Sequence, residues 1–241
     1  MNKINAQELS TLGKTFWLSF MQSKGGTSCT DNSNPELKIV LGAVQATTGT
    51  IRNPILNYTL NFSIPANGVD TVFIPAWMGY TTGSETSTSM GLIIQANDTI
   101  SVSAQNTKSN SADASLILPI EALGLDYRII SQRGGSCSEH RSSFMIVATE
   151  ANTTIDITPT TGTQGGKTAN TSFSITLNAG QSYQVRAANS SSDFSGTFVS
   201  ARDCKKIAVF GGSDRSQVTY SGCTGTVSAD HLYEQMMPVQ M

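Results

Sequence analysis

Short runs in which apolar and polar residues alternate dominate the chain, and this is the pattern of β-strands with one buried face. In residues 154–158, for example, Ile155 and Ile157 are predicted to point inward and Asp156 outward. The preceding run, Phe144–Ala148, is uniformly apolar, which predicts a strand buried on both faces. Helical periodicity is almost absent. The pattern therefore predicts an all-β fold built from antiparallel β-sandwich or jelly-roll-like units.

Two segments resemble each other without gaps, which indicates an internal repeat. FSIPANGVDTVFIPA (residues 62–76) aligns with FSITLNAGQSYQVRA (residues 173–187), and the sequence Thr-Thr-Gly-Thr precedes both. Each segment reads as strand, turn and strand, so each is expected to form a hairpin. Ser-Ala-Asp also occurs twice, at residues 111–113 and 228–230.

These matches predict two tandem sandwich repeats, one spanning residues 1–120 and the other residues 121–241. In this scheme FWLSFMQ (residues 16–22) and ELKIVLG (residues 36–42) correspond to FMIVATE and TTIDITP in the second repeat. The chain ends on EQMMPVQM, without a polar tail, as if it were cut from a longer protein.

Charged residues make up only 13% of the chain, and the formal net charge is -2. No overall field would draw the chain to phosphate backbones, so nucleic-acid binding is not expected. No apolar run approaches 18 residues, and no membrane insertion is expected. No signal peptide is recognisable either, so a secreted or cell-surface protein would have lost it. The surface rich in Ser, Thr, Asn and Gly suits that location.

The four cysteines show neither a Cys-x-x-Cys pair nor zinc-ligand spacing, which favours two disulfides in an oxidising compartment. Cys204 and Cys223 lie close in sequence and are expected to close one loop. Cys29 and Cys137 are then left as the second pair.

The two histidines are the candidates for catalysis. His231 lies between Asp230 and Glu234, where it could serve as a general base or a metal ligand. The alternative is a hydrogen-bonded residue at the end of the second repeat, and no Gly-x-Ser-x-Gly motif supports catalysis. His140 is expected in a polar loop beside Cys137. We therefore predict no catalytic residues and no enzyme.

The loop around Cys29 contains Asp31, Asn32 and Asn34, whose oxygens could bind calcium. Asx clusters are more often plain turn formers, and the EF-hand pattern is absent. No cofactor or metal site is predicted beyond this weak calcium signal.

The two tryptophans differ in context. Trp17 lies in an apolar strand and is expected in the core, whereas Trp77 begins a long polar segment, WMGYTTGSETSTSM. An exposed Trp77 with Tyr80 could stack on a sugar or anchor a protein partner. The alternative is that Trp77 covers one end of a sandwich or packs against the other repeat.

Five motifs occur in a characteristic order: GKTFWLSFM, LPIEALGLDYRIIS, SSFMIVATEANTTIDITP, LNAGQSYQV and ADHLYEQMMPV. They resemble the N-terminal domain family that is named after the IgG Fc-binding protein and also occurs in surface proteins of Bacteroidetes-type bacteria. The resemblance implies an extracellular all-β module of a larger protein without enzymatic activity, and the low Lys and Arg content suggests a bacterial member. Fc binding is implied for the animal namesake only, because no residue here can be matched to an Fc contact.

Pattern and resemblance together predict a non-catalytic adhesion or recognition module that binds a protein or glycoprotein, or a neighbouring domain of the same chain. The alternative is a carbohydrate-binding module of a secreted glycan-degrading protein, with a glycan as the partner.

Overall fold

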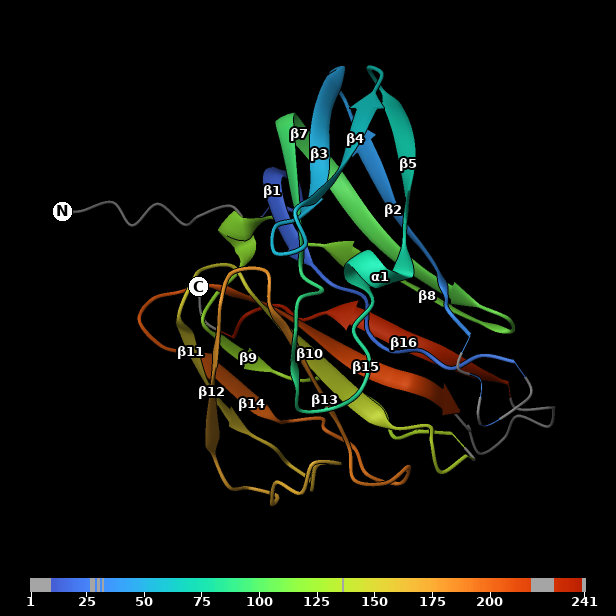
Figure 1. Ribbon diagram of the computed structural model, residues 1–241, viewed down its shortest axis with the longest axis vertical. Coiled ribbons are helices and arrows are strands. Elements are labelled where there is room, and N and C mark those ends of the chain that lie inside the picture. Colours follow the sequence, from blue (N-terminus) through green and yellow to red (C-terminus); the bar gives the residue numbers. More distant parts are fainter. Residues whose placement is uncertain are drawn as a thin grey trace.

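The computed structural model of the protein describes residues 10–26, 29, 31, 33–135, 137–217 and 228–239. Over these residues the chain is almost entirely β, and its strands form three antiparallel sheets of seven, five and four strands. Figure 1 shows the seven-stranded sheet at the top and the two smaller sheets below it. The predicted all-β antiparallel sandwich class is confirmed.

The largest sheet comes entirely from the first half of the chain. Its strands are β1 (Gly13–Leu18), β2 (Glu36–Ala43), β3 (Thr47–Asn53), β4 (Tyr58–Ile64), β5 (Gly68–Ile74), β7 (Leu92–Lys108) and β8 (Ser111–Ile117). The long strand β7 holds the sheet together, because it pairs with β1 and β3 through its first part and with β2 and β8 through its second. A short helix, α1 (Ala76–Gly79), follows β5, and a 3-10 turn, η1 (Ile120–Ala122), follows β8.

The two smaller sheets come mainly from the second half. The five-stranded sheet contains β16 (Ala229–Gln235), β15 (Ile207–Gln217), β10 (Ser142–Ala148), β13 (Ser182–Arg186) and β6 (Ser87–Thr88). The four-stranded sheet contains β12 (Phe173–Leu177), β11 (Thr153–Thr158), β14 (Phe198–Ala201) and β9 (Asp126–Arg128). Strand β6 belongs to the first half of the chain, so a loop of that half completes a sheet of the other.

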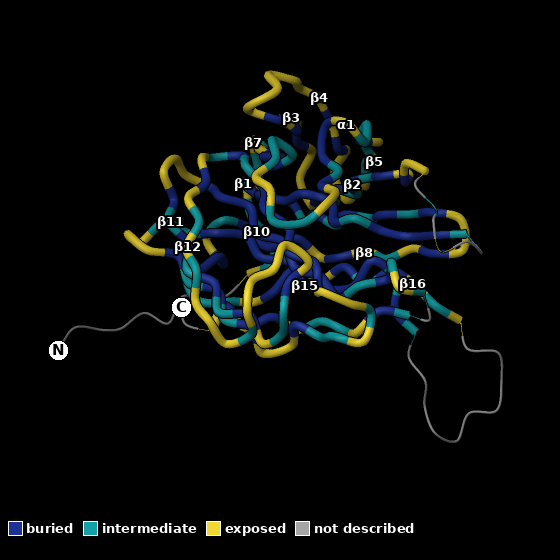
Figure 2. Tube along the Cα trace, turned by 60° about the horizontal axis from the view of Figure 1, so that its bottom comes forward, coloured by how far each residue is buried: buried dark blue, intermediate teal, exposed yellow. Residues whose placement is uncertain are grey.

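Strand β10 lies at the centre of the molecule and is buried on both faces, as the uniformly apolar run predicts. Met145 and Val147 belong to the core shared with the seven-stranded sheet, whereas Phe144 and Ile146 belong to the core shared with the four-stranded sheet. The five-stranded sheet is therefore a middle layer, and Figure 2 shows its strands β10 and β15 as mostly buried tube. Ile155 and Ile157 on β11 are buried, which confirms the predicted alternation.

The two Phe-Ser-Ile segments do not form the expected hairpins. Strand β4 pairs with β3 and β5 with β2, while β12 pairs with β11 and β13 with β10, a strand of another sheet. Asn67, with a φ of 53°, and Gly68 do form a tight turn, in which Gly68 N donates to Pro65 O. A turn of this kind reverses the chain locally, but it does not decide whether the two strands that it joins pair with each other or with other strands.

The two halves share an order of strand pairing. Strand β2 pairs with β5 and β7 as β10 pairs with β13 and β15, and β3 pairs with β4 and β7 as β11 pairs with β12 and β14. Judged by strand pairing, FMIVATE (in β10) therefore corresponds to ELKIVLG (in β2) and not to FWLSFMQ. The strand of FWLSFMQ, β1, pairs with β7 as β9 pairs with β14. The duplication itself and the boundary near residue 120 stay predictions.

Strands β8 and β16 lie side by side at the junction of the halves and are joined through side chains. Ala112 N donates to Asp230 Oδ1 at 2.7 Å, and Tyr233 N donates to Asp113 Oδ2 at 2.7 Å. The two Ser-Ala-Asp sequences thus meet at this junction, where Asp113 and Asp230 satisfy backbone N–H groups that would otherwise stay open on a sheet edge.

Candidate binding surfaces

Trp77 lies in helix α1, and the last residue of β3, Asn53, holds this helix in place. The Nδ2 atom of the buried Asn53 donates to Met78 O and to Ser89 O, both at 2.7 Å. The Oδ1 atom of the same residue accepts from Ile55 N and Leu56 N. One side chain therefore holds α1 beside the turn between β3 and β4.

The turn that Asn53 holds beside α1 carries further exposed apolar side chains. The rings of Tyr58 and Trp77 meet edge to face with centroids 4.9 Å apart, and 54% of Trp77 is exposed. We call the set Ile55, Leu56, Tyr58 and Trp77 the Trp77 surface; each member is at least 38% exposed. The other tryptophan, Trp17, is buried in the core as predicted.

Tyr80 does not share this surface with Trp77. Its hydroxyl accepts a hydrogen bond from Ser23 N at 2.9 Å and donates to Ser23 O at 3.2 Å. Burial raises the pKa of Tyr80. The sequence pairs Trp77 with Tyr80 because they are near neighbours in the chain. The residue next to Trp77 in space is Tyr58. In the sequence, only the apolar turn Pro-Ile-Leu-Asn-Tyr could have indicated that Tyr58 lies on an exposed surface.

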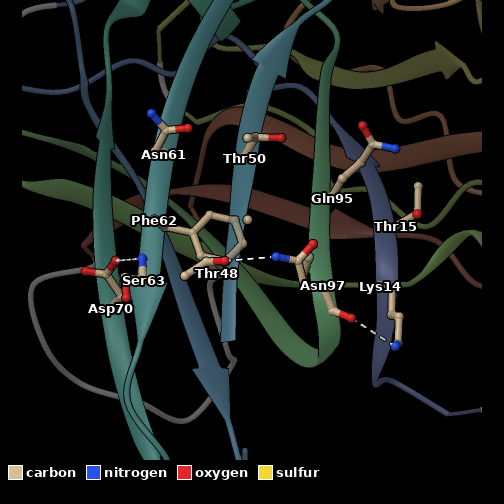
Figure 3. A pocket seen from close by; sticks show the side chains of 12 residues that line it. Lys14, Thr15, Thr48, Thr50, Asn61, Phe62, Ser63, Asp70, Gln95 and Asn97 are labelled. Atoms are coloured by element: carbon tan, nitrogen blue, oxygen red, sulfur yellow. Dashed lines mark hydrogen bonds between the residues drawn. The ribbon is translucent and has the colours of Figure 1, made fainter. Parts of the chain in front are cut away.

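A second feature is a shallow groove on the outer face of the seven-stranded sheet, with a volume of about 870 Å³. Uncharged polar side chains from four strands line it, and Figure 3 shows them side by side: Thr15, Thr48, Thr50, Asn61, Ser63, Gln95 and Asn97. The strand register explains the array, because Thr50 lies opposite both Asn61 and Gln95, and Gln95 lies opposite Thr15. We call it the polar groove; no pattern along a single strand reveals it.

Gly49 leaves room on the inner face of the sheet, beneath the polar groove, for the buried ring of Phe62, which lies opposite it. A Cβ atom at this position would lie 2.3 Å from Cζ of Phe62 and 2.3 Å from the carbonyl oxygen of Gln95. A side chain there would therefore force the strands apart.

His231 lies in the interior rather than in a cleft. Its Nδ1 atom lies 2.8 Å from Ser213 O, and its Nε2 atom lies 3.4 Å from Asn106 Nδ2, so the ring donates to the carbonyl and accepts from the amide. Asp230 and Ser111 accept from the backbone N–H of His231 and leave the ring untouched. Within the described part of the chain, this arrangement is that of a structural histidine.

His140 is also buried, and neither of its ring nitrogens has a hydrogen-bond partner among the described residues. Burial lowers the pKa of His140, and the charges of Arg215 and Lys24 lower it further. Burial likewise lowers the pKa of His231. Both rings are therefore held neutral in the folded protein at neutral pH.

The free energy of unfolding should fall as the pH drops below about 6.5, because the two histidines are then protonated in the unfolded chain but stay neutral in the folded protein. Each histidine contributes at most about 1.4 kcal/mol per pH unit. Burial raises the pKa of Asp214 and of Glu234, which acts in the opposite direction. The His231→Asn variant isolates the histidine: in urea unfolding at pH 7.5 and 5.0, it should lose less stability than the wild type. An equal loss would contradict this account of His231.

Cys29 and Cys137 form a disulfide that joins the β1–β2 connection to the β9–β10 connection, as expected. Cys204 is exposed, and its predicted partner Cys223 lies outside the described residues, so that pairing stays a prediction.

The proposed calcium ligands lie in the same connection as Cys29. Asp31 accepts hydrogen bonds from Gly25 N, Ser33 N and Lys108 Nζ. Burial alone would raise the pKa of Asp31, but the bonds from Ser33 and the charge of Lys108 outweigh it and lower the pKa to about 2. Asn32 lies outside the described residues, within which no three His, Cys, Asp or Glu side chains gather around a metal position.

The family model described as IgGFc binding protein matches residues 113–241. The chain belongs to this family. It is also 30% identical to the human IgGFc-binding protein over 154 residues, which cover 61% of this chain but only 2% of the human protein. No solved structure matches the chain.

Family membership confirms the resemblance seen in the ordered motifs at the family level. The match covers most of β8, the junction and, apart from β6, the strands of both smaller sheets, whereas the Trp77 surface and the polar groove lie before residue 113. Both candidate surfaces of this chain therefore lie outside the region that matches the family. No helix among the described residues is long and apolar enough to cross a membrane.

Proposed function

We propose that the chain is a non-catalytic, extracellular recognition module of a larger protein, and that it binds a protein or glycoprotein partner through the Trp77 surface. The exposed pair of Trp77 and Tyr58 carries this proposal. Tryptophan and tyrosine dominate binding energy at protein interfaces, because they bury large areas while losing little side-chain entropy. Asn53 fixes the turn and α1 in advance, which lowers the ordering cost of association.

An extracellular location is supported by the disulfide between Cys29 and Cys137, since such bonds persist in oxidising compartments. The low Lys and Arg content favours a bacterial cell-surface member of the family as the source. The buried ring of His231, which contacts a carbonyl and an amide instead of a serine hydroxyl, supports a role without catalysis.

The name of the human relative supplies the first partner to test, the Fc fragment of IgG. Binding of Fc to the immobilised chain should weaken by about 30-fold or more in the Trp77→Ala variant, which is the effect of losing an interface hot spot. Surface plasmon resonance with Fab as the negative analyte measures this loss.

The matched control is Ile130→Ala, because Ile130 is 72% exposed but follows β9 in the other half of the chain. This variant should bind Fc as the wild type does. Equal binding by Trp77→Ala and wild type would overturn the Trp77 surface as the binding site. A chain that captures no Fc would overturn Fc as its partner.

A further inference from the structure

We infer that the polar groove binds a neutral glycan. Seven of its twelve lining residues carry hydroxyl or amide side chains, each of which offers both hydrogen-bond donors and acceptors. Sugar hydroxyl groups have the same dual character, so such an array can satisfy several of them at once. The volume of about 870 Å³ lies within the range of about 300–1,000 Å³ usual for small-ligand sites.

The charges at the rim of the groove are already engaged, which favours a neutral ligand over an acidic or basic one. The ammonium group of Lys14 donates to Asn97 O at 3.0 Å and lies 3.4 Å from the Asp98 carboxylate. The carboxylate of Asp70 accepts from Ser63 N and Thr71 N. The lining contains one basic and one acidic residue, so its net charge favours an ion of neither sign.

An extended peptide is a poorer fit, because the floor offers little backbone to pair with. Strand β3 is paired on both sides, with β4 and β7, and the first part of β7 is paired with β1 and β3. A peptide strand binds by adding to an open sheet edge, whereas recognition on this face must come from side chains.

Part of the array is held in place before any ligand arrives. Asn97 Nδ2 donates to Thr48 Oγ1 at 2.9 Å, and Arg52 donates to Gln95 Oε1 at 3.1 Å. The side chains of Thr50, Asn61 and Ser63 make no hydrogen bond to any described residue. They are therefore available to a ligand, as is the Oδ1 atom of Asn97.

This inference extends the proposed function, on which it rests for an extracellular setting, and it gives the glycoprotein partner a second contact. The polar groove and the Trp77 surface share no residue. A glycan could thus be bound even if the proposed protein partner were wrong.

A panel of neutral, sialylated and sulfated oligosaccharides, tested on an array and then by isothermal titration, examines the inference. Neutral oligosaccharides should bind, and the double variant Thr50→Val, Asn61→Ala should weaken binding by about 10-fold or more, as expected for the loss of two hydrogen bonds. The matched control is Thr71→Val on β5, an exposed threonine outside the groove lining; it should change the affinity less than about 2-fold.

Preference for sulfated or sialylated chains, no glycan binding at all, or equal affinity of the double variant and the wild type would each overturn the inference. Circular dichroism of both variants excludes misfolding as the cause of a loss. Fc from which the glycan has been removed separates the two proposals: Trp77→Ala should still affect its binding, whereas the groove variant should not.

Discussion

Replacing Arg186 by methionine should destabilise the protein by about 3–5 kcal/mol, because it leaves a carboxylate buried without its partner. The side chain of Asp214 is fully buried, and only 5% of the Arg186 side chain is exposed. Two nitrogens of the Arg186 guanidinium donate to Asp214 Oδ2, and the group also reaches Gln164 Oε1 and Glu139 O. Burial raises the pKa of Asp214, and Arg186 opposes this shift.

Urea unfolding followed by far-UV circular dichroism measures the loss. The double variant Arg186→Met, Asp214→Asn should recover part of it, since a neutral amide costs less to bury than an unpaired charge. The matched control is Arg202→Met, which breaks the exposed pair with Asp156 and should change stability little. If Arg186→Met and Arg202→Met lose the same stability, the buried pair does not have the role described.

Replacing Tyr233 by alanine should cost about 3–5 kcal/mol, the usual cost of truncating a fully buried aromatic residue. The ring stacks on Phe210 with centroids 5.3 Å apart and lies 6.1 Å from Phe20 of the first half. Its hydroxyl donates to Ser19 O at 2.8 Å. Tyr233 therefore ties the middle sheet to the segment that follows β1.

The Tyr233→Phe variant keeps the stack and loses one hydrogen bond, so it should cost only about 1 kcal/mol. Tyr58→Ala, at a partly exposed position, should cost less than Tyr233→Ala. Because Tyr233 contacts both halves, its loss should shift a single unfolding transition measured by tryptophan fluorescence and by circular dichroism alike. Two separate transitions would show that the halves unfold independently.

The interlocking of the halves gives a reason to expect one transition. Glu85, in the loop that carries β6, accepts hydrogen bonds from Thr163 Oγ1 and Gly165 N in the second half. Gln22 N donates to Gln184 Oε1, and Gln184 Nε2 donates to Gly83 O. Segments of the first half are thus part of the second.

The sequence by itself determined the class of fold and the burial of its central strands. Alternation along the chain decides which side chains of a strand are buried, so residues such as Ile155, Ile157 and Trp17 lie where the pattern places them. The uniformly apolar run of β10 likewise required two covered faces, and the five ordered motifs identified the family.

Only the tertiary structure decided which strands pair and which side chains share a surface. The hairpin prediction failed at residues 62–76 because the turn at Asn67 specifies a reversal of the chain and not a partner strand. Trp77 contacts Tyr58 rather than Tyr80, and Thr50 lies opposite Asn61 and Gln95; these neighbours are also distant in the sequence. Spacing along one strand controls the face on which a side chain lies, whereas contacts between distant strands depend on register and sheet order, which the whole core selects together.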